Sequence, residues 1–268
     1  MAAVNPLSEA EQAYNFPPPP GGGSPWSDGP GTAASLLPVI QRFREKAGIG
    51  EAAPDFSARH LDGGEFRLDS LRGRNVFLMF GSLTDPPCSS NMRTTRPSLA
   101  ELYERYAPRG IEFVWIYTRE AFPGSRLPAH RSFEQKIAHA RRFKEEEQAP
   151  FPVVVDSLDG AAHKLYGESF HNANFLIDWA GAIVFKATHL DASELPAAFD
   201  DLLSWQRIDS GVWLMKKSYS ERIRMCQAPY DIAAREKEWR ALERNGPEVY
   251  QRLRERGFDP LTWKREGK

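Results

Sequence analysis

The sequence predicts an α/β fold in which parallel strands alternate with helices, and three observations support this prediction. Apolar runs of strand length lie at 76–80 and 111–117, and each is followed by a segment with helically spaced apolar residues. A third apolar run lies at 151–155 and precedes a short helical segment. Two further strands around a turn at 179–181 lead into a closing helix at 193–203. Strands joined by helices pair in parallel through crossovers, whereas the last two strands form an antiparallel hairpin.

Turn and breaker residues define the remaining elements. A short helix is expected at 36–47 because a glycine follows it, and an Asp-Gly turn places a β-hairpin within 61–68. Pro97 should split the helix that follows the strand 76–80, since proline lacks the N–H of a helical hydrogen bond. The next helix is expected at 132–147. We expect the strand 76–80 to be central in a mostly parallel sheet.

The composition along the chain divides it into three parts. Residues 1–35 are rich in Pro, Gly, Ser and Ala, which predicts a disordered N-terminal tail because this composition buries little apolar surface. Residues 36–204 hold the α/β domain. Residues 205–268 are expected to form an ordered helical C-terminal extension, with helices at 232–245 and 247–256, because their many large aromatic side chains are costly to leave in water. The extension should therefore pack on the main domain, on a protein partner or on a second copy in a homodimer.

The overall composition argues against several function classes. The net charge is −1, so nothing indicates nucleic-acid binding, and no apolar run reaches the roughly 20 residues of a membrane-spanning helix. The first residues lack the basic and apolar regions of a secretory signal. Two cysteines are too few for a disulfide framework, which fits a reducing compartment. We therefore expect a cytoplasmic protein that binds neither nucleic acid nor membrane.

The stretch 75–88 carries the strongest functional signal. A strand of buried type runs into a tight turn, and the sequence Asp-Pro-Pro-Cys then opens an amphipathic helix. A helix start offers free N–H groups and the positive end of the helix dipole, which favour a thiolate. Such a strand–turn–helix junction is typical of the active site of the thioredoxin-like fold. The usual nucleophile position, three residues before Cys88, holds Asp85.

Three segments of the chain resemble the iodothyronine deiodinases, a branch of the peroxiredoxin-like thioredoxin superfamily. Residues 81–87 read Gly-Ser-Leu-Thr-Asp-Pro-Pro, which is similar to the family's Gly-Ser-Cys-Thr-Sec-Pro-Pro. Residues 117–123 read Tyr-Thr-Arg-Glu-Ala-Phe-Pro and resemble Tyr-x-Glu-Glu-Ala-His-Pro, and residues 130–134 resemble His-Arg-Ser-Leu-Glu. The spacing also agrees, and the resemblance covers about residues 50–203. It implies a thioredoxin-like fold with an extra N-terminal β-hairpin.

The resemblance also implies a chemistry that this sequence has altered. In the family, a selenolate or thiolate attacks iodine on an iodinated phenol, a histidine handles the phenol proton, and thiols recycle the selenium. Glu120 and His130 are kept. Four positions depart from the family pattern, namely those of the selenocysteine, the assisting cysteine, the histidine of the second segment and an arginine before the last hairpin, which hold Asp85, Leu83, Phe122 and Ala173. The active site is therefore degenerate, and true iodothyronine deiodination is not expected.

Asp85 and Cys88 each have two interpretations. Asp85 is a preferred N-cap residue ahead of two prolines that suit a first helical turn, and its carboxylate should stay ionised there. Alternatively, Asp85 acts directly as a catalytic or ligand-binding group. Cys88 is either a reactive thiol in the first helical turn or a small core residue. A disulfide between Cys88 and Cys226 stays open, because the sequence does not give their distance.

Glu120 and His130 complete the set of candidate catalytic residues. Histidine titrates near neutral pH, which suits proton transfer, and Glu120 ends a strand, where the catalytic groups of α/β folds gather. The structural alternatives are a buried ion pair of Glu120 with Arg119 or Arg131, and a hydrogen bond from His130 to the loop 123–128.

No cofactor or metal ion is predicted. His163 and His171 lie eight residues apart with Asp156 upstream, which is not the spacing of a metal site. The glycines at 81 and 160 belong to turns, and nothing matches a nucleotide-binding pattern.

Two classes of function remain. The first is a deiodinase-like redoxin, a thiol-dependent oxidoreductase that uses Cys88 to reduce a peroxide, a disulfide or a small halogenated aromatic compound. The second is a non-catalytic binding or assembly protein that keeps the thioredoxin-like fold after losing the nucleophile. The Pro-Pro-Cys sequence at 86–88, Glu120 and His130 favour the first class, and the two extensions favour the second.

Overall fold

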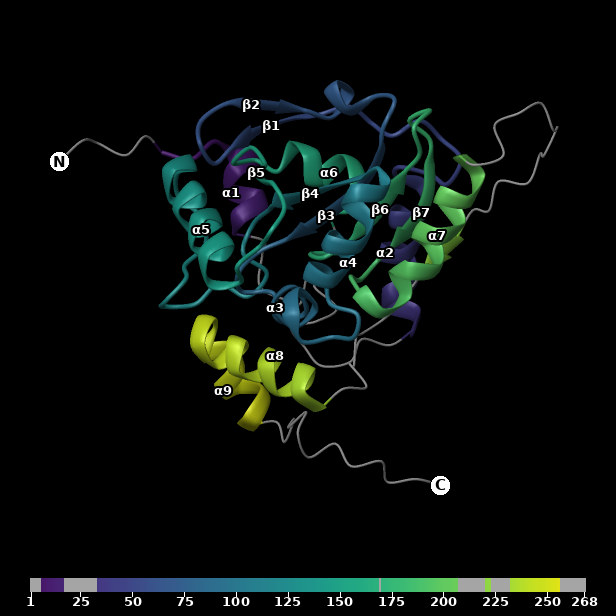
Figure 1. Ribbon diagram of the computed structural model, residues 1–268. Helices are drawn as coiled ribbons and strands as arrows, with labels where there is room; N and C mark the ends of the chain where they lie inside the picture. Colours follow the sequence, from purple (N-terminus) through teal and green to yellow (C-terminus); the bar gives the residue numbers. More distant parts are fainter. Residues whose placement is uncertain (1–5, 17–32, 169, 207–219, 223–231, 256–268) are drawn as a thin grey trace.

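The computed structural model describes residues 6–16, 33–168, 170–206, 220–222 and 232–255, which are arranged around one mixed sheet (Figure 1). Within these residues the strand order is β2-β1-β5-β4-β3-β6-β7-β8. The strands are β1 (Ser57–His60), β2 (Glu65–Arg67), β3 (Asn75–Gly81), β4 (Ile111–Tyr117), β5 (Val153–Val155), β6 (Asn174–Ile177), β7 (Ile183–Ala187) and β8 (Ser220–Arg222).

The centre of the sheet confirms the predicted position of β3, but the sheet as a whole is not mostly parallel. β3, β4 and β5 are parallel neighbours, as their helical crossovers require. β1 pairs in antiparallel fashion with both β2 and β5, and β6 does so with both β3 and β7. The short turns of the β1–β2 and β6–β7 hairpins force their strands to run in opposite directions. The parallel character is therefore limited to the centre and to the β7–β8 pair.

Both faces of the sheet are covered. Along β3, Phe77 and Met79 face one apolar cluster, while Val76, Leu78 and Phe80 face the other. Burial on both faces explains why β3 reads as a continuous apolar run rather than an alternating one. The helices are α1 (Glu9–Asn15), α2 (Ala33–Glu45), α3 (Pro86–Arg93), α4 (Leu99–Tyr106), α5 (Phe133–Glu146), α6 (Ala161–Tyr166), α7 (Leu195–Gln206), α8 (Ile232–Asn245) and α9 (Pro247–Glu255).

The helix after β3 is divided as Pro97 predicts. α3 ends at Arg93 and α4 begins at Leu99, after Ser98. The Ser98 side chain accepts a hydrogen bond from the backbone of Glu101, whose side chain in turn accepts one from the Ser98 backbone. This reciprocal capping box gives α4 its own start.

Part of the N-terminal segment that was expected to be a disordered tail is a docked helix. α1 starts with a capping box between Ser8 and Glu11, and the Tyr14 side chain is buried in the domain. The Tyr14 ring lies against Gly160, where a Cβ would come within 2.1 Å of it. One large aromatic side chain that fills a cavity thus outweighs the average composition of the segment. Residues 33–35 of the expected tail belong to α2, and residues 1–5 and 17–32 lie outside the described residues.

The C-terminal extension packs on the domain, in agreement with one of the expected arrangements. α8 lies against α3, and α9 lies beside α8 (Figure 1). Trp239 of α8 is buried, and its ring centroid lies 4.7 Å from that of Tyr250 in α9. β8 adds a strand beside β7. The aromatic residues at 213, 219, 230, 258 and 263, on which the prediction also relied, lie outside the described residues.

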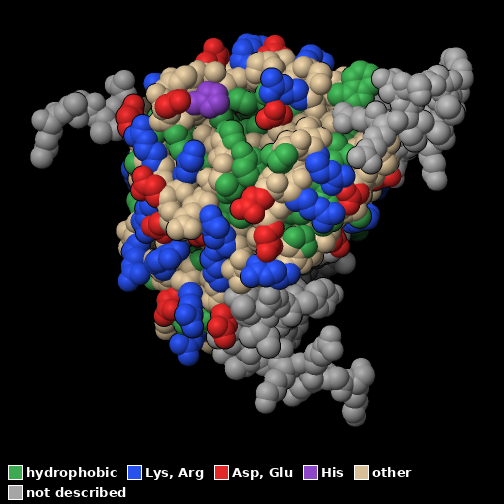
Figure 2. Space-filling model, viewed as in Figure 1, with side chains coloured by type: hydrophobic (Ala, Val, Ile, Leu, Met, Phe, Trp, Pro, Cys, Tyr) green, Lys and Arg blue, Asp and Glu red, His purple; other side chains and the backbone are tan. Residues whose placement is uncertain are grey.

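The described surface agrees with the near-neutral composition. On the face seen in Figure 2, Lys and Arg side chains are interspersed with Asp and Glu. Within the described residues, none of the helices combines the length and the apolar character that crossing a bilayer requires.

Candidate functional site

The β3–α3 junction places Asp85 and Cys88 where the sequence predicts. β3 ends at Gly81, and α3 starts at Pro86 with Asp85 as its N-cap residue. A Cβ on residue 81 would lie 2.5 Å from Cys88 Sγ and 2.4 Å from the Trp115 ring. Glycine at this position therefore leaves room for the thiol to point back into the core, where Cys88 is fully buried.

Asp85 occupies the N-cap position of α3 but does not cap the helix with its side chain. Its side chain makes no capping hydrogen bond to α3, and it is only 4% exposed. Its carboxylate Oδ2 lies 3.4 Å from Cys88 Sγ, which donates to it. Burial raises the pKa of Asp85 to about 7, against the opposing hydrogen bonds from Cys88 and Asn172. Loss of hydration thus opposes the field of the helix start, which on its own would favour an ionised carboxylate.

Cys88 is a thiol rather than a thiolate in this environment. Burial and the nearby Asp85 carboxylate raise the pKa of the Cys88 thiol well above its usual value. The helix N-terminus alone does not overcome these two effects. In the part of the chain that the structure describes, Cys88 is not in a disulfide, and Cys226 lies outside it. The burial fits the interpretation as a core residue, and the contact with Asp85 fits the reactive one.

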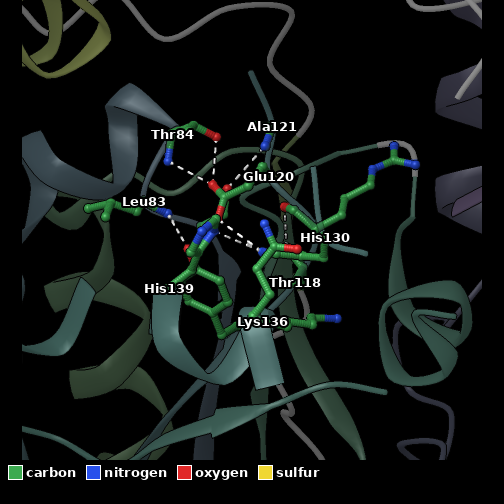
Figure 3. A network of polar contacts seen from close by, with 12 residues as sticks. Leu83, Thr84, Thr118, Glu120, Ala121, His130, Lys136 and His139 are labelled. Carbon is green, nitrogen blue, oxygen red and sulfur yellow. Dashed lines mark hydrogen bonds and ion pairs between the residues drawn. The ribbon is translucent and has the colours of Figure 1, made fainter. Parts of the chain in front are cut away.

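A second polar cluster surrounds Glu120 (Figure 3). Glu120 Oε1 accepts a hydrogen bond from the Tyr117 hydroxyl at 2.6 Å and lies 2.9 Å from His139 Nδ1 and 3.2 Å from His130 Nε2. The two imidazole nitrogens are 3.2 Å apart. Glu120 Oε2 accepts hydrogen bonds from the Thr84 backbone and hydroxyl, at 3.2 and 2.8 Å.

These contacts differ from both structural alternatives suggested by the sequence, which were an arginine ion pair for Glu120 and a hydrogen bond to the loop 123–128 for His130. Arg119, one expected ion-pair partner, donates to the backbone carbonyl of Tyr14 instead. His130 uses Nε2 toward Glu120 and His139, and its Nδ1 has no hydrogen-bond partner among the described residues. The sequence singled out Glu120 and His130 as candidates, but it did not predict that they contact each other or identify their other partners.

His139 is the site residue that sequence reasoning missed. It lies in α5, three residues after Lys136 and four before Phe143, which are both buried. Residues at these separations share one face of a helix. From the helical periodicity of α5, one could therefore have predicted that His139 lies on the face of the helix that is turned toward the domain.

Burial and hydrogen bonding shift the pKa values of Glu120 and His130. Burial tends to raise the pKa of Glu120, but hydrogen bonds with His130 and His139 hold it well below its usual value. Burial lowers the pKa of His130. At neutral pH the cluster thus contains an ionised Glu120 beside a neutral His130.

The loop between β3 and α3 connects the Asp85–Cys88 pair to the polar cluster around Glu120. The Leu83 backbone N–H donates to the Tyr117 hydroxyl at 3.1 Å, and Thr84 binds Glu120. Asn245, the last residue of α8, donates to the Leu83 carbonyl at 3.2 Å. The C-terminal extension therefore contacts the loop that holds Asp85.

Comparison with known proteins assigns the chain to a family. Residues 49–186 match the AhpC/TSA family model. The chain belongs to the AhpC/TSA family. The match agrees with the thioredoxin-like α/β fold predicted from the sequence, and it spans every strand from β1 to β6 and most of β7.

Curated relatives are thiol–disulfide oxidoreductases and a deiodinase. The chain is 31% identical over 140 residues to the thiol-disulfide oxidoreductase ResA of Bacillus thuringiensis subsp. konkukian, covering 52% of this chain and 69% of the relative. ResA of Geobacillus thermodenitrificans is 32% identical over 143 residues, covering 53% and 71%. Thyroxine 5-deiodinase of Gallus gallus is 30% identical over 141 residues, covering 48% and 52%. This protein is thus a thioredoxin-fold protein of the thiol–disulfide oxidoreductase type.

Among solved structures, a putative thiol:disulfide interchange protein DsbE from Chlorobium tepidum has a TM-score of 0.46 and 23% identity, covering 58% of this chain and 97% of that one. An uncharacterized conserved protein from Geobacillus kaustophilus has a TM-score of 0.45 and 19% identity, covering 65% and 89%.

Proposed function

We propose that this protein is a thiol-dependent oxidoreductase with one redox cysteine, in which Cys88 is the reacting thiol and Asp85 is its base. The observation that carries the proposal is the 3.4 Å contact between Cys88 Sγ and Asp85 Oδ2 at the start of α3. The pKa of Asp85, raised by burial to about 7, suits a group that takes and returns a proton at neutral pH. The names of the ResA relatives support this class of activity.

The reaction that this pair supports is thiol–disulfide exchange. The Asp85 carboxylate takes the Cys88 proton, and the thiolate attacks one sulfur of a substrate disulfide. A mixed disulfide with Cys88 forms, and the second substrate sulfur leaves as a thiol with the proton held by Asp85. An external thiol then attacks the substrate sulfur of the mixed disulfide, so that Cys88 is released and takes up the proton of that thiol. One disulfide and one thiol are consumed, and one disulfide and one thiol are formed.

The deiodinase-like segments indicate common ancestry with the deiodinases, although the reaction that we propose differs from theirs. Three motifs and the thyroxine 5-deiodinase similarity support descent from a common scaffold. Asp85 stands where that family has selenocysteine, and a carboxylate oxygen has little affinity for iodine. We therefore assign a disulfide, rather than an iodinated phenol, as the substrate class.

The burial of Cys88 favours a second candidate, a binding or assembly protein that does not turn over a substrate. The thiol is fully buried, and its pKa is raised by that burial and by Asp85. In this candidate the Cys88–Asp85 contact is part of the core, and the surface of the domain and its extension binds a partner protein.

Trapping of a mixed disulfide on Cys88 distinguishes the two candidates. A Cys226→Ser chain leaves Cys88 as its one thiol, and it is incubated with an excess of glutathione disulfide between about pH 5 and pH 9. For an oxidoreductase, mass spectrometry should show glutathione on Cys88, formed at a rate that rises through about pH 7, and Asp85→Asn should abolish that rise. Asp62→Asn, which changes an exposed carboxylate, is the matched control. Labelling of Cys88 only at the rate of global unfolding would support the binding protein instead.

A further inference from the structure

We propose that Glu120, His130 and His139 form a binding site for a divalent first-row transition metal ion, separate from the Cys88–Asp85 pair. The three side chains come from the segment after β4, the loop before α5 and α5 itself, and they meet near the carboxyl end of β4 (Figure 3). Their potential ligand atoms all lie within 4.8 Å of one another. The proposal rests on how these atoms face each other.

The protons of the two imidazoles cannot form a hydrogen bond on every side of the cluster. Glu120 Oε1, His130 Nε2 and His139 Nδ1 form a triangle with sides of 2.9, 3.2 and 3.2 Å. Each side is short enough for a hydrogen bond, so each needs one donor and one acceptor. If one imidazole nitrogen carries a proton, the lone pair of the other faces the carboxylate oxygen. If both carry protons, both N–H groups can donate to the carboxylate oxygen, and the two nitrogens then lie 3.2 Å apart with no hydrogen bond between them.

Without an ion, and with Glu120 ionised, one short side of the triangle therefore has no hydrogen bond in either combination of tautomers. A cation in contact with all three atoms removes the conflict, because each atom then offers a lone pair. This is the arrangement in which two neutral imidazoles and a carboxylate bind metals in proteins. The cluster is consequently better explained by three ligands than by three hydrogen-bond partners.

The distances between the three ligand atoms match those around a bound metal ion. For metal–ligand bonds of about 2.1 Å, neighbouring ligands are about 3.0 Å apart on an octahedral face and about 3.4 Å apart in a tetrahedron. The observed sides of 2.9 to 3.2 Å lie close to the first value and within a few tenths of an ångström of the second. An ion therefore fits with small side-chain movements and no change in the backbone.

Hydrogen bonds from neighbouring groups hold the Glu120 carboxylate in position. The Thr84 backbone and hydroxyl both donate to Glu120 Oε2, which directs Oε1 toward the two histidines. The Tyr117 hydroxyl donates to Oε1. Hydrogen bonds of this kind orient the ligands of metal sites and tune their affinity. Since His139 is 12% exposed, the site also has one side on which water or a substrate could complete the coordination.

The ligand set determines which ions should bind. Imidazole nitrogen suits zinc, iron, cobalt and nickel, whereas magnesium and calcium prefer sites made entirely of oxygen. We therefore expect Zn²⁺ and Co²⁺ to bind and Mg²⁺ and Ca²⁺ not to compete. The ligands are ten and nineteen residues apart along the chain, so no compact sequence motif announces them.

The test is a metal titration of the untagged full chain after treatment with a chelator. Co²⁺ should bind with a stoichiometry of one, giving ligand-field bands without a sulfur-to-cobalt charge-transfer band, which separates this site from one built on Cys88 or Cys226. Zn²⁺ should displace Co²⁺. His139→Ala and Glu120→Gln should each lower the affinity at least about tenfold. His60→Ala, on β1, is the matched histidine control and should leave the affinity unchanged.

Saturating Zn²⁺ should also raise the melting temperature of the wild type but not that of His139→Ala, because an ion that binds the folded state stabilises it. His139 is partly exposed, so this variant should keep the wild-type circular dichroism, and His139→Gln replaces it if it does not. Folded wild type that binds neither Co²⁺ nor Zn²⁺, or binding that survives both ligand substitutions, would overturn the proposal. These readouts do not involve Cys88, so the metal site and the oxidoreductase proposal can fail independently.

Discussion

The Tyr14 hydroxyl lies 2.8 Å from His163 Nδ1, a residue 149 positions further along the chain. Both side chains are buried, and Arg119 donates to the backbone carbonyl of Tyr14 at 3.0 Å. Burial lowers the pKa of His163 to about 3, so its ring is neutral at physiological pH. A neutral imidazole can accept a hydrogen bond from the Tyr14 hydroxyl at Nδ1, while its Nε2–H lies 3.2 Å from the Phe170 carbonyl oxygen and can donate to it. Tyr14 thus fixes the N-terminal helix to the domain, together with Asn15, whose side chain donates to the Leu158 carbonyl at 2.7 Å.

Removing the hydroxyl of Tyr14 should destabilise the domain. Tyr14→Phe leaves His163 Nδ1 buried without its partner, which costs about 1–3 kcal/mol. Tyr14→Ala also leaves a cavity beside Gly160, and we expect a loss of about 3–5 kcal/mol. Urea unfolding of the full chain measures both changes. Tyr103→Phe, in a partly buried tyrosine of α4, is the control and should change the unfolding free energy by less than about 0.5 kcal/mol.

A side chain at residue 81 should be poorly tolerated. In Gly81→Ala the new Cβ would lie 2.5 Å from Cys88 Sγ and 2.4 Å from the Trp115 ring, so the core has to shift. Such overpacking costs about 1–3 kcal/mol. Gly64→Ala, where the nearest atom lies 3.7 Å from the new Cβ, should be close to neutral in the same unfolding experiment. Equal stability of the two variants would show that the Cys88 environment is looser than described.

The C-terminal extension should contribute to the stability of the domain. α8 buries Trp239, Ala241 and Leu242, and Asn245 binds the loop that precedes α3. Burial of one large apolar side chain is worth about 1.5–3 kcal/mol, so a chain that ends at residue 206 should lose at least about 3 kcal/mol or become insoluble. Urea unfolding and size-exclusion chromatography measure the effect. A shortened chain that is equally stable and keeps its oligomeric state would make the extension an independent appendage.

The fold was predictable because β3 and β4 are buried on both faces, and continuous apolar runs of that length have few alternatives. The junction at Asp85 and Cys88 was predictable for a similar reason, since two prolines after a strand define a helix start. α1 escaped prediction because its docking depends on the cavity beside Gly160, which is formed by residues far away in sequence.

Only part of the candidate site was predicted, because His139 and the contacts of Glu120 and His130 were missed. Glu120 and His130 were identified, but their partners were expected to be arginines and a loop, whereas the structure gives His139, Tyr117 and Thr84. The raised pKa of Asp85 was not predicted because a helix start is visible in sequence and the burial of its N-cap side chain is not. Protonation states follow from three-dimensional desolvation, which a local pattern does not contain.

Asp85 should make the protein less stable as the pH rises. Its pKa in the folded protein is about 7 rather than the usual 3.8, because burial raises it. Between these two values the folded chain holds a proton that the unfolded chain has released, so the unfolding free energy falls with rising pH. Each pKa unit corresponds to about 1.4 kcal/mol, and the total effect is therefore on the order of 4 kcal/mol at most. The contribution is fully present below about pH 4 and absent above about pH 7.

Replacing Asp85 by a neutral residue of the same size should remove this dependence. Asp85→Asn can still accept a hydrogen bond from Cys88 Sγ but carries no charge at any pH. Its unfolding free energy, relative to the wild type, should therefore increase between about pH 5 and pH 8 by roughly 2–3 kcal/mol. Asp62→Asn, at an exposed hairpin turn, should follow the wild-type profile. Parallel profiles for Asp85→Asn and the wild type would show that Asp85 is ionised throughout, and the basis for its role as a proton acceptor at neutral pH would be lost.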